Sequence, residues 1–199
     1  RFTYGSTVLC TFTGKTHLLP SRSFSENMEK IRRNHWLPVA PRNLPQGDIS
    51  ILFPGDISIL VQHPHIEDFA AYDHFAKPLG LLWLASYVRE WFDVDFINAL
   101  DRENPREKPV SFKEDGTGNF QRRIISKPEE LADIPRNYKR YGLSDSVFLD
   151  ELEGVRTPDY IFLSSAMTYW YGGVLHTLGL LRQVFPDVTV FLGGIYAAL

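Results

Sequence analysis

The sequence of 199 residues contains a single cysteine, Cys10. One cysteine cannot form an internal disulfide, so the reducing cytoplasm is the expected location. One cysteine also cannot supply the several thiolates that hold an iron–sulfur cluster or a cysteine-rich zinc ion. We therefore expect no such centre on this chain alone.

Long apolar runs, a basic surplus and a leader pattern are also lacking. The longest apolar stretch, residues 79–88, is shorter than the roughly 18 residues of a membrane-spanning helix. The 21 basic and 24 acidic residues give a net charge of −3, which argues against general nucleic-acid binding. The N-terminus does not have the basic and then apolar pattern of a signal peptide. We expect neither a membrane nor a nucleic acid as a partner.

The first 50 residues predict little regular structure. Residues 1–14 alternate weakly and suit a pair of strands, residues 25–36 suit a short helix, and residues 37–47 contain three prolines, as linkers often do. We interpret 1–50 as an N-terminal extension and 51–199 as the domain. At its start GDISILFP is nearly repeated as GDISILVQ, and the second copy is the better candidate for the first strand because an ordered pattern follows it.

From Asp56 onward, strand and helix patterns alternate. Strands are predicted at 57–62, 94–100, 159–165 and within 186–194, with helices at 79–92 and 174–185. This alternation favours parallel βαβ units with right-handed crossovers. We predict an α/β fold, a Rossmann-like (flavodoxin-like) doubly wound parallel sheet. The helix at 79–92 is apolar almost all round, so we expect it to be buried.

A long insertion, residues 102–157, separates the second and third strands. Its last part predicts a helix with Ser144 or Asp145 as N-cap, and residues 127–134 carry a weaker helix signal. Residues 136–141 are basic and aromatic, which suits an interface. We expect the insertion to cap a ligand crevice or to pack on another domain.

Ligands of open α/β sheets bind beyond the carboxyl ends of the strands, where the strand order reverses. This rule selects residues 63–73, 101–106, 164–173 and 193–199. The third segment is the most distinctive, because hydroxyl groups and flat aromatic rings follow the strand: Ser164, Ser165, Thr168, Tyr169, Trp170 and Tyr171. They suit a large planar ligand with polar edges. The alternative is an aromatic plug that covers the core.

The remaining signals are weaker. The pair Gly193–Gly194 allows the backbone to pass close to a ligand, or is simply a tight turn. His63 and His65 do not have the spacing of a zinc signature, so we favour a solvated loop for them. His176 falls within the last helix pattern, and no Ser–His–Asp arrangement is readable from spacing.

Most of residues 56–199 resembles the N-terminal cobalamin-binding domain of a family of cobalamin-dependent radical SAM proteins. The stretches that carry the resemblance are AAYDHFAKPLGLLWLASYVRE, GTGNFQRRIISKPEELADIPRNYKRYGL, PDYIFLSSAMTYWYGGV and FPDVTVFLGGIYAAL. The resemblance implies that the corrin ring of cobalamin lies on the carboxyl ends of the strands. It implies that the nucleotide tail passes Ser164 and Thr168, which have the family's spacing, and Gly193–Gly194. The expected cobalamin-binding set is completed by His63, Pro64, Ser165, Tyr169 and Trp170.

Two departures from the family pattern shape the expected function. Cobalamin domains commonly carry Asp-x-His-x-x-Gly, whose His ligates cobalt, but DHFAKPLG at 73–80 has the wrong spacing, so we expect no metal ligand from this chain. The family also continues into a catalytic barrel with Cys-x-x-x-Cys-x-x-Cys, which holds an iron–sulfur cluster and cleaves S-adenosylmethionine. We interpret this chain as a fragment without that barrel.

These expectations leave three hypotheses about the function. The first is a cobalamin-binding module of a radical SAM methyltransferase or related enzyme, with the missing barrel as partner and no catalysis by this chain. The second is a degenerate domain that serves as a structural or protein-interaction element without cofactor. The third is a stand-alone enzyme that uses residues 168–171. If the sheet stops after the fourth strand, the apolar edge of that strand is exposed and invites self-association.

Overall fold

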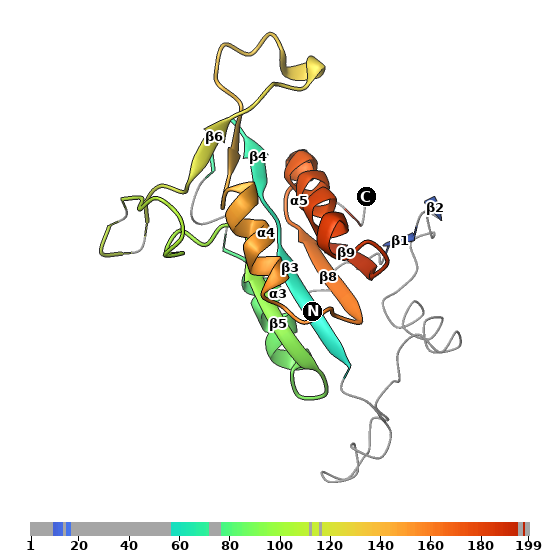
Figure 1. Cartoon of the computed structure of the whole chain (residues 1–199). Coiled ribbons are helices and arrows are strands. Elements are labelled where there is room, and N and C mark those ends of the chain that lie inside the picture. Colours follow the sequence, from blue (N-terminus) through green and yellow to red (C-terminus); the bar gives the residue numbers. More distant parts are fainter. Residues whose placement is uncertain are drawn as a thin grey trace, which may run out of the picture.

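The centre of the molecule is a sheet of four parallel strands (Figure 1). The computed structural model describes residues 10–13, 15–16, 57–71, 77–111, 113–115, 117–194 and 197. The parallel strands are β3 (Ser58–His63), β5 (Asp93–Asn98), β8 (Tyr160–Ser165) and β9 (Thr189–Gly194). They lie in the order β9–β8–β3–β5. This α/β architecture is consistent with a Rossmann-like fold.

Helices cover both faces of this sheet. Helix α3 (Leu79–Val88) lies on one face, and α4 (Asp145–Glu153) and α5 (Tyr171–Val184) lie on the other (Figure 1). Along β3, Leu60 joins the core under α4 and α5, whereas Ile59 and Val61 pack against α3. Strands β3, β8 and β9 are apolar on both sides because both faces of the sheet are covered, whereas β5, at the edge of the sheet, exposes Asp93 and Asp95. All four were predicted to within a few residues.

A second, smaller sheet lies beyond the carboxyl end of β3. It contains β4 (Ile66–Asp68), β7 (Lys139–Tyr141) and β6 (Arg122–Ile124), all antiparallel. Residues 102–157 supply β6, the short 3-10 helix η2 (Glu129–Leu131), β7 and α4. Helix α4 follows Ser144, as expected, and its Phe148 and Leu152 are fully buried in the main core. Of residues 136–141, which the sequence suggested for an interface, residues 139–141 pair with β4 of the same chain.

Three local expectations were wrong. Helix α3 is not buried, because it packs mainly on β3 and β5 with one side, and Leu79 and Trp83 are 71% and 72% exposed. The predicted loop 166–173 contains the 3-10 helix η3 (Thr168–Trp170) and the first turn of α5. The predicted solvated loop after β3 is instead β4, preceded by the buried His65.

The outer edge of β9 has a strand partner. Strand β1 (Cys10–Thr13) runs antiparallel to β9, with Cys10 opposite Leu192, and pairs in turn with β2 (Lys15–Thr16). The edge that the sequence suggested would be exposed is therefore paired at this point. The predicted helix at 25–36, the linker at 37–47 and the first GDISIL copy lie outside the described residues. Within the described residues, no helix has both the length and the apolar character needed to span a membrane.

Candidate functional site at the carboxyl edge of the sheet

The predicted site residues gather where β3, β8 and β9 end. Ser164 is in register with Gly193, and Ser165 with Gly194. Strands β3 and β8 pair as far as Gln62 and Leu163, one residue before His63 and Ser164. From β3 the chain moves to β5 on one side and later to β8 on the other, so the strand order reverses at this edge. Such a switch point is where open α/β sheets bind ligands.

The backbone at this edge is tightly packed. Ser165, only 2% exposed, donates its hydroxyl hydrogen to the carbonyl oxygen of Gly193 over 2.9 Å. Gly194 has a φ of +102°, and a β-carbon at that position would collide with the carbonyl oxygen of Ser165. The glycine is therefore required by the strand contact itself. Solvent reaches Ser164, which is half-buried, and Gly194, which is exposed.

The residues after β8 divide into two groups. Trp170 is buried, and its indole Nε1 donates a hydrogen bond to Asp68 Oδ2 over 2.8 Å. It packs with residues of the second sheet, as the aromatic-plug alternative expected. Tyr169 is 57% exposed and Thr168 is half-buried. Of the aromatic pair Tyr169 and Trp170, only Tyr169 offers a face to a ligand.

His63 and Pro64, the other predicted binding residues, leave β3 at the same edge but are both buried. Their side chains are thus part of the packing between β3 and its neighbours. They contribute to the position of the edge rather than to an open surface.

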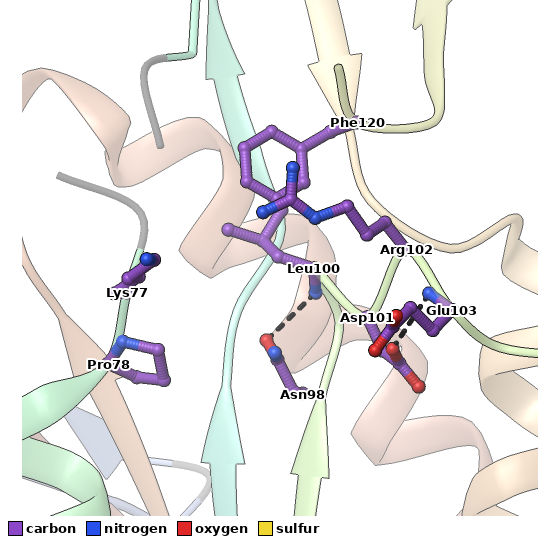
Figure 2. Close-up of a pocket in the computed structure, with 8 residues that line it drawn as sticks. All are labelled: Lys77, Pro78, Asn98, Leu100, Asp101, Arg102, Glu103 and Phe120. Carbon is purple, nitrogen blue, oxygen red and sulfur yellow. Dashed lines mark hydrogen bonds between the residues drawn. The ribbon is translucent and has the colours of Figure 1, made fainter. Parts of the chain in front are cut away.

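A pocket of about 190 Å³ lies beyond the end of β5 (Figure 2). Arg102 lies over the ring of Phe120, 4.9 Å from its centroid, and Asn98 Oδ1 accepts a hydrogen bond from the backbone of Leu100. The strand pattern in the sequence indicated the segment 101–106, but not the contributions of neighbouring segments to the pocket. The pocket combines cationic, acidic and aromatic groups that suit a small polar ligand, and its lining residues are Lys77, Pro78, Asn98, Leu100, Asp101, Arg102, Glu103 and Phe120.

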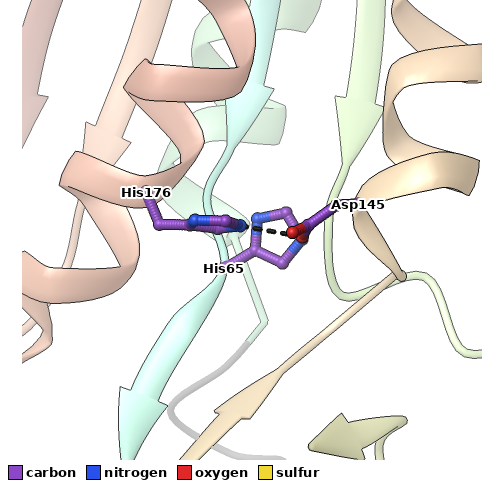
Figure 3. A group of neighbouring side chains, drawn as sticks. All are labelled: His65, Asp145 and His176. Atoms are coloured by element: carbon purple, nitrogen blue, oxygen red, sulfur yellow. Dashed lines mark hydrogen bonds and ion pairs between the residues drawn. The ribbon is translucent and has the colours of Figure 1, made fainter. Parts of the chain in front are cut away.

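A histidine–aspartate cluster lies between α4 and α5, beyond the end of β3 (Figure 3). The ligand atoms of His65, Asp145 and His176 lie within 4.8 Å of one another. They come from the junction of β3 and β4, from the start of α4, and from α5. No local spacing in the sequence indicates this cluster, because only the tertiary fold brings the three residues together.

Both ring nitrogens of His65 already have hydrogen-bond partners. Its Nε2 lies 3.0 Å from the carbonyl oxygen of Leu143, and its Nδ1 lies 2.9 Å from Thr177 Oγ1. A carbonyl only accepts, so Nε2 carries the proton and Nδ1 accepts from the hydroxyl. Burial, with a smaller contribution from neighbouring His176, lowers the pKa of His65 to about 3. His65 is therefore neutral and structural.

The carboxylate of Asp145 is also occupied. His176 Nε2 lies 2.8 Å from Asp145 Oδ1, and the Arg123 guanidinium of β6 contacts the same oxygen. Burial opposes ionisation of Asp145, but its bond with His176 and the charge of Arg123 hold its pKa below the usual value. Burial also lowers the pKa of His176. Imidazole and carboxylate groups suit Zn²⁺ in principle, but an ion here would have to displace the Arg123 cation.

The carboxyl edge, with Ser164, Thr168, Tyr169 and Gly194 accessible, remains the best candidate for a binding site. Its hydroxyl groups can bond a polar ligand, and Tyr169 can stack on a planar one. No described side chain at this edge forms an evident nucleophile and base pair. No family model matches this chain, and no curated protein and no solved structure is detectably similar to it, so any assignment of function depends on the chain's own residues.

Proposed function

We propose that this chain is the cobalamin-binding module of a radical SAM enzyme and performs no catalysis by itself. The observation that supports this most is the pairing of Ser164 with Gly193 beside the switch point of the sheet, with Thr168 three residues beyond the end of β8. If β3, β5, β8 and β9 are numbered 1 to 4 along the chain, their order across the sheet is 2-1-3-4. This order agrees with a flavodoxin-like sheet. The resemblance in sequence assigns those same residues to the nucleotide tail of cobalamin.

The side chains at the edge agree in part with such a cofactor. Ser164 and Thr168 are half-buried hydroxyls that can bond the polar tail, and Tyr169 offers a flat exposed face. The 190 Å³ pocket is smaller than the roughly 300–1,000 Å³ of enclosed small-molecule sites. The corrin would therefore lie on the open edge. When bound, cobalamin supplies cobalt-centred group transfer, and this chain's residues bind and orient it.

The histidines described at this edge are not placed to ligate cobalt. His63 is 3% exposed and His65 is fully buried, with both ring nitrogens of His65 already bonded. The proposal therefore gives cobalt no imidazole from these residues, in line with the missing Asp-x-His-x-x-Gly motif. The iron–sulfur cluster and S-adenosylmethionine would be held by a separate barrel, the proposed partner.

One set of contacts favours the alternative, a cobalamin-type domain that acts as a structural element without cofactor. Trp170 is held in the core by Asp68, and the Ser165 hydroxyl bonds Gly193. Two residues that the resemblance assigns to binding thus serve packing here. This alternative predicts that cobalamin does not bind, whatever the side chains at positions 164 and 168.

The test is retention of hydroxocobalamin after desalting, followed by its visible absorption. We expect retention by the wild type and a loss of at least about tenfold in affinity for Thr168→Leu and Ser164→Leu, whose bulk blocks the proposed tail path. Thr157→Leu is the matched control, because Thr157 is an exposed threonine that precedes β8 at the opposite edge. Retention that is equal in all variants would contradict the proposed site, and no retention by any would favour the structural alternative.

A further inference from the structure

An apolar stripe runs along the outer side of α3. Leu79, Leu82, Trp83 and Tyr87 are 71%, 42%, 72% and 54% exposed. Their spacing of three, four and eight residues from Leu79 places them on one side of the helix, which we call the outer stripe. Leu81, Ala85 and Val88 are buried on the opposite side, toward the sheet. The helix thus has two apolar sides, and within the described part of the chain only the inner one is packed.

The aromatic side chains of the outer stripe are ordered against one another. The rings of Trp83 and Tyr87 are stacked, with centroids 5.9 Å apart and planes 10° apart. Tyr87 in turn contacts Trp91 edge-to-face, with centroids 4.8 Å apart. Exposed apolar patches of this size mark interaction sites, and Trp and Tyr are the residues that most often dominate binding energy. Pre-ordered rings reduce the entropy lost on binding.

We propose that the outer stripe pairs with the outer stripe of a second copy of this chain, through an antiparallel contact of the two α3 helices. Spacings of three and four residues are those that helices use to pack on helices. None of residues 79–88 is charged, so two copies meet without repulsion. When the outer stripes of two copies pack together across a two-fold axis, the same surface is buried on both subunits.

An axis between Trp83 and Leu84 gives the pairing a complementary shape. It places Tyr87 of one copy opposite Gly80 of the other, since both are the same number of residues from the axis. Gly80 is exposed, and the space around its missing β-carbon is empty to 4 Å, so it can receive a ring.

The area of the stripe predicts a weak dimer. At these exposures, four side chains of this size leave on the order of 500 Å² of accessible surface open per copy. Two copies would bury about 1,000 Å², near the lower limit for specific interfaces. Association should therefore depend on concentration. This inference does not rest on cobalamin binding, and either can fail without the other.

The test is sedimentation equilibrium of the full chain from low micromolar to several hundred micromolar concentrations. We expect a monomer–dimer equilibrium whose dissociation constant rises at least about tenfold in Trp83→Glu and in Tyr87→Glu. These side chains are exposed, so the far-ultraviolet circular dichroism should not change. Gly80→Leu should weaken the dimer similarly by filling the space for Tyr87, while favouring the helix.

Leu175→Glu is the matched control, since Leu175 is a 50% exposed apolar residue on α5, on the other face of the sheet. It should leave the dimer intact. A wild type that is monomeric over the whole range would overturn the proposal, as would a dimer that survives Trp83→Glu. An equal weakening of the dimer in Leu175→Glu would also overturn the proposal, because association would then be non-specific. A dimer unaffected by Gly80→Leu would overturn the antiparallel arrangement.

Discussion

Gly173, in the first turn of α5, lies directly against the carbonyl group of His65, so closely that a β-carbon on Gly173 would overlap that oxygen. This contact brings the start of α5 onto β4. Because η3 directly precedes α5, the contact also fixes Thr168 and Tyr169 at the carboxyl edge. Gly173 therefore serves the close approach of a helix to a strand.

Substitution of Gly173 by Ala should destabilise the fold. The new methyl group meets backbone atoms that cannot rotate away, so we expect a loss of about 1–3 kcal/mol in the free energy of unfolding. Urea denaturation measures it. Gly179→Ala is the control in the same helix, because no atom lies within 4 Å of its β-carbon position. Gly179→Ala should raise the free energy of unfolding by about 0.5–1 kcal/mol. Similar effects at positions 173 and 179 would contradict the close contact between Gly173 and His65.

Gly194→Ala should also destabilise, for a different reason. The φ of +102° is a conformation that alanine adopts only with strain, and the methyl group would collide with Ser165. We expect a loss of about 1–3 kcal/mol, measured by urea denaturation. Gly154, at the C-cap of α4 with a φ of −73°, is the control, and its change to Ala should cost less. A stable Gly194→Ala variant would show that β9 ends differently.

Acid should weaken the fold through His65. Its pKa is about 3 in the folded protein against an ordinary 6.5, so above pH 6.5 both states are neutral and the full stability is present. As the pH falls from 6.5 toward 3, the unfolded chain binds a proton that the folded chain does not, and stability declines by up to about 1.4 kcal/mol per pH unit. Urea denaturation across this range measures the decline.

A second measurement assigns that effect to the residue. The imidazole nitrogen shifts of His65 should keep neutral values, with the proton on Nε2, down to about pH 4. A ring that titrates near its ordinary pKa would be incompatible with the buried hydrogen bonds to Leu143 and Thr177.

Added Zn²⁺ should not raise the melting temperature. The nitrogens of His65 have partners, and Arg123 contacts the Asp145 carboxylate that an ion would need. Differential scanning calorimetry with Zn²⁺ and then with a chelator tests this expectation. A stabilisation that disappears in His176→Ala would instead identify the cluster as a metal site.

Strands β3, β8 and β9 were predictable because each contains a continuous apolar run, whereas β5 contains Asp95 and was predicted from the alternation of strand and helix patterns. The choice between the two GDISIL copies also has a physical reason. Gln62 in the second copy corresponds to Pro54 in the first, and β3 pairs with strands on both sides. Proline has no N–H for a central strand, so the second copy is the one that suits this position. The adjacency of Ser164 and Gly193 followed from the parallel strand order.

What the sequence did not predict depends on contacts between distant segments. Strand β4 is short, and its partner β7 lies more than 70 residues later, so its pattern reads as a loop. Trp170 is buried because Asp68 and the second sheet receive it, which no local pattern records. The exposure of Trp83 was missed because apolar periodicity does not tell how many sides of a helix find partners.

The most direct test of the proposed site is an amide chemical-shift map of the full chain as hydroxocobalamin is added. The account predicts the largest shifts at Ser164, Thr168, Tyr169 and Gly194, and none at Thr157 or Asp159 on the opposite edge. Shifts confined to other surfaces, or no shifts at saturating cobalamin, would contradict a cobalamin site at the carboxyl edge.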